Sequence, residues 1–239
     1  MQTRLDKFLT EMGYGTRSEV KKRIKSKQIT INGTVAVKPE QKLDPEADIV
    51  CCNGKQISYC QYEYYLFHKP AGCVTATEDN LHKTVMDYLT DTVRSDLFPV
   101  GRLDIDTEGL LLITNDGALA HELLSPAKHV AKTYFAVIEG IVTDEDVNFF
   151  ENGVDIGEKS LTKPGVLRVL KSEPKSEIEL TITEGKFHQV KRMFEAVGKK
   201  VLYLKRISMG PLQLPEDLAP GDYRPLTEEE IAALKKCNK

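Results

Sequence analysis

The first part of the chain shows a helical spacing of apolar residues. The pattern i, i+3, i+4, i+7 is followed by Leu5, Phe8, Leu9 and Met12. A second helix is predicted to begin between Thr16 and Ser18, with Val20 and Ile24 as its inward pair. After it, the strand-like stretches 29–31 and 34–37 flank Asn32-Gly33, a pair that favours a tight hairpin turn. The N-terminal region is therefore predicted to contain two helices and a hairpin.

The rest of the chain alternates short strands and helices. Residues 51–62 are predicted to be a connector, and the apolar run 64–67 is predicted to open a second domain. Strands are predicted at 109–114, 133–138, 177–183 and 201–207, and helices near 84–89, 118–124, 144–152 and 188–197. The connections are irregular rather than repeated βαβ units, which predicts an α+β fold with a largely antiparallel mixed sheet. The expected domains are residues 1–55 and 62–239.

Composition and charge narrow the class of protein. The chain has 239 residues, 41% of them hydrophobic and 29% charged, as in ordinary globular proteins. The charged start and the lack of a long apolar run predict a cytoplasmic protein without membrane spans. Its five cysteines show no paired C-x-x-C spacing, so reduced cysteines are expected and a zinc site is not.

The charge is unevenly distributed along the chain. Residues 1–45 contain ten Lys/Arg and five Asp/Glu, a net of +5, so the remainder carries −8 of the total −3. The surface of the second helix is rich in basic residues, namely Arg17, Lys21, Lys22, Arg23, Lys25 and Lys27. Such a cluster neutralises phosphates and binds RNA with little sequence preference. This region resembles the S4 RNA-binding domain over about 55 residues.

A carboxylate-rich segment carries the strongest motif. Residues 101–111 read G-R-L-D-I-D-T-E-G-L-L. On composition alone they fit a solvated loop as well as a catalytic one. As a pattern, they resemble the central motif of pseudouridine synthases of the small-subunit rRNA branch. Four further matching stretches follow the family order, at 68–72, 132–134, 184–193 and 218–227. Together with the S4-like start, the resemblance covers nearly the whole chain.

The resemblance implies specific roles for three residues. Asp104 occupies the family position of the essential carboxylate. Tyr134 occupies the position of the active-site tyrosine that stacks on the uracil. A carboxylate in a dry site needs a nearby cation to stay ionised, and Lys191 matches the position of that partner. Other branches have Arg there, which offers a bidentate fork instead of a point charge. Arg102 is expected to fill the gap left by the extruded uridine.

The implied reaction breaks the N1–C1′ bond of uridine, turns the uracil and rejoins it through C5. It involves no redox change, so no metal or cofactor is expected. Asp104 would either attack covalently or take the C2′ proton. Extracting the base from the RNA costs a few kcal/mol. Lys132, Lys186, His188 and Arg192 are candidate phosphate or base-edge contacts that offset this cost.

Other classes of function remain open on the residues alone. His121-Glu122 begins like a zinc-protease motif, but Ser125 stands where the second histidine belongs. A glycoside hydrolase could use Asp104 with Asp106 or Glu108. A non-catalytic assembly factor would need the S4-like region alone. Within the synthases, we expect an enzyme that acts on 16S rRNA in a partly assembled small subunit. The alternative is a branch that acts on 23S rRNA. A monomer is the default expectation.

Overall fold

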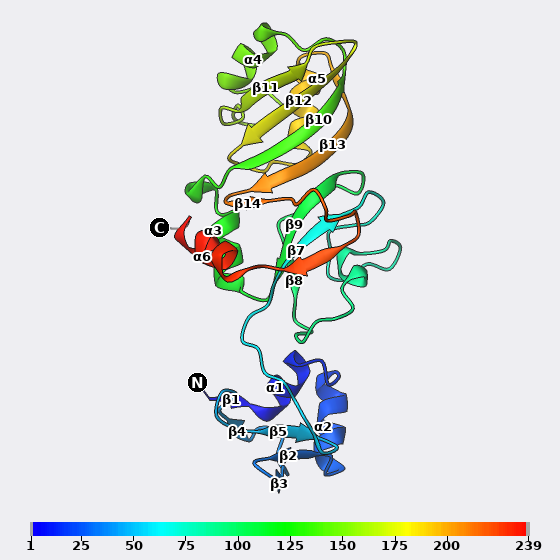
Figure 1. The fold of residues 1–239 in the computed structure, drawn as a ribbon, viewed down its shortest axis with the longest axis vertical. Helices are drawn as coiled ribbons and strands as arrows, with labels where there is room; N and C mark the ends of the chain where they lie inside the picture. Colours follow the sequence, from blue (N-terminus) through cyan, green and yellow to red (C-terminus); the bar gives the residue numbers. More distant parts are fainter. Residues whose placement is uncertain (1, 238–239) are drawn as a thin grey trace. The chain divides into compact units, whose positions relative to one another are not determined.

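The computed structural model describes residues 2–237, so residues 1, 238 and 239 at the outer limits of the predicted domains lie outside it. The chain forms two compact units. One comprises the chain up to Glu63 together with Thr90–Leu97, and the other comprises Tyr64–Leu89 and the chain from Phe98 onward. We call them the N-terminal and the catalytic-motif unit, and Figure 1 labels most of their elements. The predicted ranges were continuous, whereas both units are discontinuous in sequence.

The N-terminal unit contains the predicted helices and hairpin. Its elements are β1 (Thr3–Arg4), α1 (Leu5–Glu11), α2 (Arg17–Lys25), β2 (Ile29–Ile31), β3 (Thr34–Val35), β4 (Lys42–Leu43), β5 (Val50–Cys52) and β6 (Lys55–Gln56). Thr16 caps α2 through a capping box with Glu19. Asn32 and Gly33 have φ values of 50° and 78°, as a two-residue type I′ hairpin turn requires. The apolar faces of both helices and the strands form one core.

The predicted connector is wrong for residues 51–56. They form a second hairpin, in which β5 and β6 are joined by Asn53-Gly54 with φ values of 50° and 80°. The resulting four-stranded sheet has the order β3-β2-β5-β6. The Asn-Gly pair was a readable turn signal, but its flanking strands are too short to show an apolar period.

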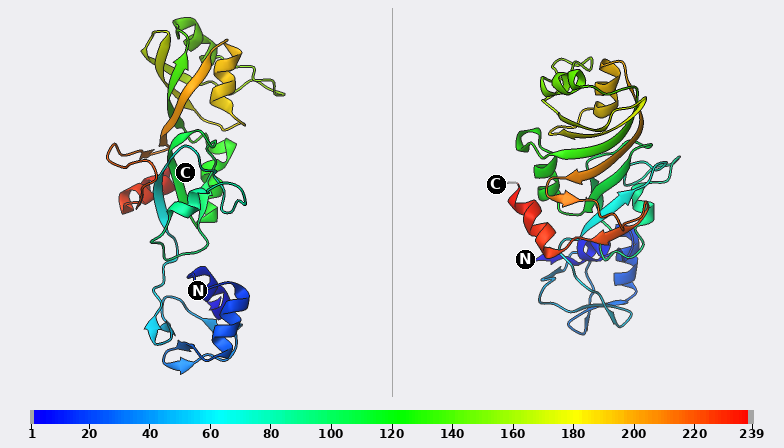
Figure 2. Two further views of the ribbon diagram at one scale, coloured as in Figure 1. Left: turned by 90° about the vertical axis from the view of Figure 1, so that its right-hand side faces the viewer. Right: turned by 45° about the horizontal axis from the view of Figure 1, so that its top comes forward.

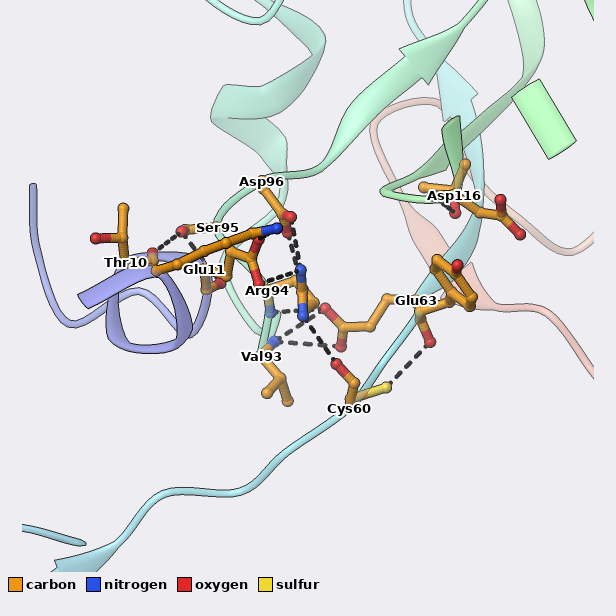
Figure 3. Close-up of polar contacts among 12 residues, drawn as sticks. Thr10, Glu11, Cys60, Glu63, Val93, Arg94, Ser95, Asp96 and Asp116 are labelled. Carbon is orange, nitrogen blue, oxygen red and sulfur yellow. Dashed lines mark hydrogen bonds and ion pairs between the residues drawn. The ribbon is translucent and has the colours of Figure 1, made fainter. Parts of the chain in front are cut away.

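Residues 90–97 join the N-terminal unit although they follow the start of the second unit in sequence. Arg94, whose side chain is 6% exposed, pairs with Asp96 at 2.6 Å and with Glu11 at 3.2 Å. Ser95 donates from its backbone N–H to Glu11 O and from its hydroxyl to Thr10 O (Figure 3). The Glu63 carboxylate accepts from the backbone N–H groups of Val93 and Arg94. These contacts hold the segment on α1.

The catalytic-motif unit is built on one nine-stranded sheet. Its path runs β11-β12-β10-β13-β9-β7-β15, with β14 paired to β13 and β8 to β9. The strands are β7 (Tyr64–Lys69), β8 (Phe98–Val100), β9 (Glu108–Thr114), β10 (Lys132–Glu139), β11 (Val166–Lys171), β12 (Lys175–Ile182), β13 (Lys200–Met209), β14 (Leu212–Gln213) and β15 (Tyr223–Pro225). Among the described residues, every ladder of this sheet is antiparallel except β9–β13. The predicted α+β class with a largely antiparallel mixed sheet is confirmed.

The helices of this unit pack on the sheet over two apolar clusters. They are η1 (Val85–Tyr88), α3 (Gly117–Leu124), η2 (Pro126–Lys128), α4 (Asp144–Glu151), α5 (Gln189–Ala196) and α6 (Glu228–Lys236). One cluster joins α4 and α5 to β10, β12 and β13, and the other joins α3 and α6 to β7 and β9. Figure 2 shows α5 lying along β13. In residues 2–237, no helix combines the length and the apolar character that crossing a bilayer needs.

Candidate active site

The predicted catalytic motif forms a loop between β8 and β9 that a buried lysine holds in place. Lys69 at the end of β7 is fully buried, and its ammonium donates hydrogen bonds to backbone carbonyls. It donates to Asp104 O at 3.0 Å, to Thr107 O at 2.9 Å and to Pro70 O at 3.1 Å. Burial lowers the pKa of Lys69. A single cation thereby fixes the loop backbone from Asp104 to Thr107.

The segment after β7 also binds the loop. Thr75 Oγ1 donates to Leu103 O at 2.8 Å, and Leu103 N donates back to Thr75 Oγ1 at 3.1 Å. Gly72 N donates to Ile105 O at 2.7 Å. Leu103 itself is buried in the cluster beneath α5. The Asp104 backbone is thus held by neighbours on both sides, which limits where its carboxylate lies.

The structure brings Asp104 and Lys191 together. Lys191 Nζ on α5 lies 3.1 Å from Asp104 Oδ2 and 2.6 Å from Asp106 Oδ1, so it bridges two carboxylates. His188 Nε2 lies 3.5 Å from Asp104 Oδ1. The Asp104 side chain is 28% exposed and therefore accessible to a substrate. It has basic groups near both of its oxygens.

The charges of this cluster shift the pKa values of Lys191 and Asp106 toward their ionised forms. Burial lowers the pKa of Lys191, but hydrogen bonds and attraction from Asp106 and Asp104 outweigh it and raise that pKa. Burial likewise raises the pKa of Asp106, yet the hydrogen bond and charge of Lys191 bring it below its ordinary value. Lys191 therefore stays protonated between the two carboxylates at neutral pH.

Asp104 lies on a cavity of about 830 Å³, a size suited to a nucleoside and its neighbours. Tyr134 on β10 lines the same cavity and is only 8% exposed. His188 also lines it, with φ of 48° at the start of α5 and its ring stacked 3.8 Å from that of Phe187. Phe187 is 70% exposed at this cavity.

The remaining predicted contacts divide into two groups. Arg102 is exposed and lines the cavity, and Lys132 lines it but is buried. Lys186 also lines it, yet its Nζ donates to Ser160 O and Leu161 O at 3.1 and 3.2 Å. Arg192 pairs with Glu158 at 2.8 Å and donates to Ile156 O, so its guanidinium is held by the protein.

The basic helix α2 presents most of its predicted cations to solvent, whereas Lys27, predicted on the same helix, lies beyond its last residue, Lys25. Val20 and Ile24 are buried, as their spacing predicted. Arg17, Lys21, Lys22 and Lys25 are exposed, and Arg23 is half-buried. The N-terminal unit thus carries a compact row of cations on one helix.

Sequence reasoning missed three residues of this site. Lys69 stands in the H-K-P-x-G stretch, whose only signal was its place in the family pattern. Asp106 was considered only as a glycosidase partner, although it binds Lys191 at 2.6 Å. Arg206 lies near the end of the predicted strand 201–207, and no local pattern marks it as a cavity residue.

Comparison of the chain with known proteins shows the family to which it belongs. Residues 63–196 match the family described as RNA pseudouridylate synthase, which covers more than half of the chain. The chain belongs to this family. Residues 3–49 match the S4 domain, so the predicted combination of an S4 domain with a pseudouridine synthase domain is confirmed.

Individual members of the RNA pseudouridylate synthase family are similar over nearly the whole length. An uncharacterized RNA pseudouridine synthase of Bacillus subtilis is 47% identical, covering 98% of each chain. The ribosomal small subunit pseudouridine synthase A is 44% identical in Yersinia pestis, covering 97% of each chain. The Escherichia coli K12 enzyme of that name is 42% identical, covering 97% of this chain and 99% of its own.

A solved structure supports the same family. A crystal structure of a pseudouridylate synthase matches with a TM-score of 0.69 and 36% identity, covering 97% of this chain and 99% of its own. The chain is therefore an enzyme of the pseudouridine synthase type.

Proposed function

We propose that the protein converts a uridine of 16S ribosomal RNA to pseudouridine, with Asp104 as the essential carboxylate. The observation that carries this proposal is the shared cavity. Asp104 and Tyr134 both line the large cavity, and together with Lys191, the cation bound to Asp104, they also line a smaller pocket of about 90 Å³. Because the chain belongs to the RNA pseudouridylate synthase family, this arrangement is best suited to cleaving and re-forming a glycosidic bond.

In this proposal the Lys191 ammonium, 3.1 Å from Asp104 Oδ2, stays paired with that carboxylate while the bound base excludes water. The Asp104 carboxylate then either attacks C1′ or takes the C2′ proton as the N1–C1′ bond breaks. The 3.1 Å contact to Lys191 leaves the other carboxylate oxygen facing His188 at 3.5 Å, a separation long enough to change when substrate binds. No redox partner is required, because the product is an isomer of the substrate.

Tyr134 is the proposed stacking surface for the uracil. Its ring is fixed in the sheet between β12 and β13, where Leu180 and Arg206 lie opposite it. A rigid ring holds the detached uracil near C1′ while it turns. Arg102, exposed at the same cavity, is the proposed side chain that occupies the place of the extruded uridine. Such occupation offsets part of the cost of unstacking, a few kcal/mol.

The proposed substrate follows from the relatives and from the S4 domain. The names of the Yersinia pestis and Escherichia coli relatives assign those enzymes to the small ribosomal subunit. In this chain, the cations of α2 supply phosphate contacts that hold a structured RNA independently of its sequence. We therefore place the substrate in 16S rRNA of a partly assembled small subunit, where the target uridine is accessible.

Tritium release from C5-labelled uridine tests the substrate. The unmodified protein and Asp104→Asn are incubated with 16S transcript, 23S transcript and partly assembled small subunits. Release from the 16S substrates by the unmodified protein alone is the expected result. Release from 23S transcript alone would move the substrate to the large subunit. No release from any substrate, with RNA binding intact, would favour a non-catalytic assembly factor.

A further inference from the structure

Two buried cations lie beside Tyr134 on the cavity. Lys132 is 9% exposed and Arg206 is 2% exposed, and both line the cavity that contains Asp104. Lys132 precedes Tyr134 by two residues on β10, so both side chains point to the same face of the sheet. Arg206 on β13 is the cross-strand partner of Tyr134. We call this face, defined by Lys132, Tyr134 and Arg206, the cavity floor.

These cations have no negative partner within the described part of the chain. Lys132 Nζ donates to Val130 O at 3.1 Å, and Arg206 Nε donates to Leu110 O at 2.8 Å. No ion pair joins either residue to a carboxylate of residues 2–237, and Arg206 Nη2 is buried without a hydrogen-bond partner there. Burial, and then the charge of Arg206, lower the pKa of Lys132 to about 8.

An uncompensated buried pair of like charges is costly for folding. In an active site, by contrast, such a pair of cations stabilises an anion that forms there during the reaction. The depth of the pair decides which anion this is. A phosphodiester continues into the RNA chain on both sides, so it lies at the mouth of a cavity, whereas the extruded base enters it. The cavity floor includes Tyr134, the proposed stacking partner of that base.

The base becomes an anion when its glycosidic bond breaks. The electron pair of the C1′–N1 bond stays on N1, and the negative charge spreads over N1, O2 and O4 of the uracil. In one route an Asp104 oxygen bonds to C1′. In the other route Asp104 takes the C2′ proton of the sugar. The uracil carries one negative charge in either route and loses it when C5 bonds to C1′, as Asp104 leaves C1′ or returns its proton to C2′. The C5 proton then departs and N1 takes up a proton, which gives the isomer.

We propose that Lys132 and Arg206 are catalytic residues that stabilise the detached uracil anion on the cavity floor. This inference rests on the proposed function and adds the step that the cations assist. The unpartnered Nη2 of Arg206 supplies a donor for a uracil oxygen, and Lys132 supplies a second charge at the same floor. Because both cations are buried, each charge acts more strongly than it would in water.

The test separates the rate of bond cleavage from RNA binding and from folding. Lys132→Met keeps nearly the same shape and removes the charge, and Lys175→Met, at an exposed position of β12, is its matched control. We expect Lys132→Met to lower the single-turnover rate about 100-fold, as for loss of one preorganised charge-stabilising donor. Its Kd for the RNA should stay within about twofold, since the ground-state base is neutral. Its thermal midpoint should not fall, because a buried charge has been removed.

Arg206 provides a second pair of variants, because it sits deeper. Arg206→Lys keeps a charge in less volume, so it should retain at least about tenfold more activity than Arg206→Met if charge is the decisive property. A normal rate for Lys132→Met would overturn the inference. A raised Kd with a normal rate at saturating RNA would make Lys132 a phosphate contact instead, and a lowered midpoint with proportional loss of activity would make it structural.

The unmodified protein and Asp104→Asn are assayed in the same series. If the unmodified protein itself showed no turnover on any RNA, the proposed function would fail together with this inference. If it turned over and Lys132→Met did so equally well, the inference alone would fail.

Discussion

Single residues of this protein carry charges whose surroundings determine what they do. Lys69 and Lys132 are both buried lysines of the same sheet. Lys69 is surrounded by carbonyl acceptors of the catalytic loop, whereas Lys132 has one carbonyl and a neighbouring guanidinium. The first environment satisfies the ammonium, and the second leaves its charge available. We therefore expect opposite effects on stability when each lysine is replaced.

Replacing Lys69 by Met should destabilise the protein and disable the site. The carbonyls of Asp104 and Thr107 would lose their donor and remain buried. We expect the free energy of unfolding to fall by about 3 kcal/mol, the scale of hydrogen bonds to a charged group that are lost in a buried site. Urea denaturation measures it, and exposed Lys175→Met, expected within about 0.5 kcal/mol, is the control. A Lys69→Met protein with normal stability would contradict this role.

The Lys132 charge predicts a pH dependence. Because its pKa is lowered to about 8, the ammonium is lost as the pH rises through that value. We expect kcat/KM to fall above pH 8 by up to about tenfold per unit, since this parameter reports groups of the free enzyme. Other ionisable groups line the cavity as well, namely Arg102, Asp104, Tyr134, Glu184, Lys186, His188 and Arg206.

Lys132→Met separates Lys132 from those groups. The variant should lose the alkaline limb, and a limb that persisted would belong to another residue. The free energy of unfolding provides an independent check on the direction of the Lys132 pKa shift. The unfolded chain keeps this proton up to about 10.5, so the contribution of Lys132 to the free energy of unfolding rises between pH 8 and 10.5.

At the scale of elements, the parallel contact between β9 and β13 connects the catalytic loop to the cavity floor. Gly109 makes this contact possible, since a Cβ there would lie 2.2 Å from Arg206 O. Its φ of 110° is also a conformation that side chains disfavour. The glycine of the motif therefore allows a close backbone approach immediately after the loop that carries Asp104.

Gly109→Ala should separate the two strands. We expect loss of about 3 kcal/mol or more in the free energy of unfolding, from the clash and the positive φ together. Gly117→Ala is the control, because that glycine begins α3 with nothing within 4 Å of its Cβ position. Thermal unfolding of both variants measures the difference in stability. Equal stability of the two variants would contradict a close backbone contact at Gly109.

The helix α2 is the element proposed to bind RNA. Charge reversal by Lys21→Glu and Lys22→Glu should weaken binding of 16S rRNA at least about tenfold, and lower the slope of log Kd against log salt by about 1 to 2. The same double reversal at exposed Lys171 and Lys175 on β11 and β12 serves as the control. Equal losses in both variants would indicate a general charge effect rather than a binding helix.

Elements with a regular apolar period could be predicted, whereas short or long-range features could not. The inward pair Val20 and Ile24 and the Asn32-Gly33 turn were readable because neighbouring residues determine them. Strand β6 has two residues, too few for any period. Arg206 became visible as a site residue only once β13 paired with β10, because register determines which face it shares with Tyr134. Asp104 was found through the family pattern, not through its composition.

At the scale of the whole molecule, the chain alternates between its two compact units. Residues 90–97 belong to the first unit through Arg94, which lies 83 positions from its partner Glu11. Such a pairing has no local signature in the sequence, so it could not be predicted. It makes the N-terminal unit depend on a segment outside the S4 match at residues 3–49.

Arg94→Met should therefore weaken the N-terminal unit. Removing the guanidinium leaves Glu11 and Asp96 without their part-buried partner, at an expected cost of about 2 kcal/mol. Hydrogen exchange should show faster exchange of the amides of Val93, Arg94 and Ser95, which now donate to Glu63 and Glu11. Unchanged protection would show that the backbone bonds hold this segment without the arginine.

The central claim is that the Asp104 carboxylate performs the isomerisation, and direct detection of pseudouridine tests it. Ribosomal RNA is incubated with the unmodified protein, Asp104→Asn or Asp106→Asn, digested, and analysed for the C-linked nucleoside. We expect no product from Asp104→Asn, with folding and RNA binding intact, and product within about tenfold of normal from Asp106→Asn, whose more exposed carboxylate shares Lys191. Product from Asp104→Asn at the rate of the unmodified protein would contradict the account.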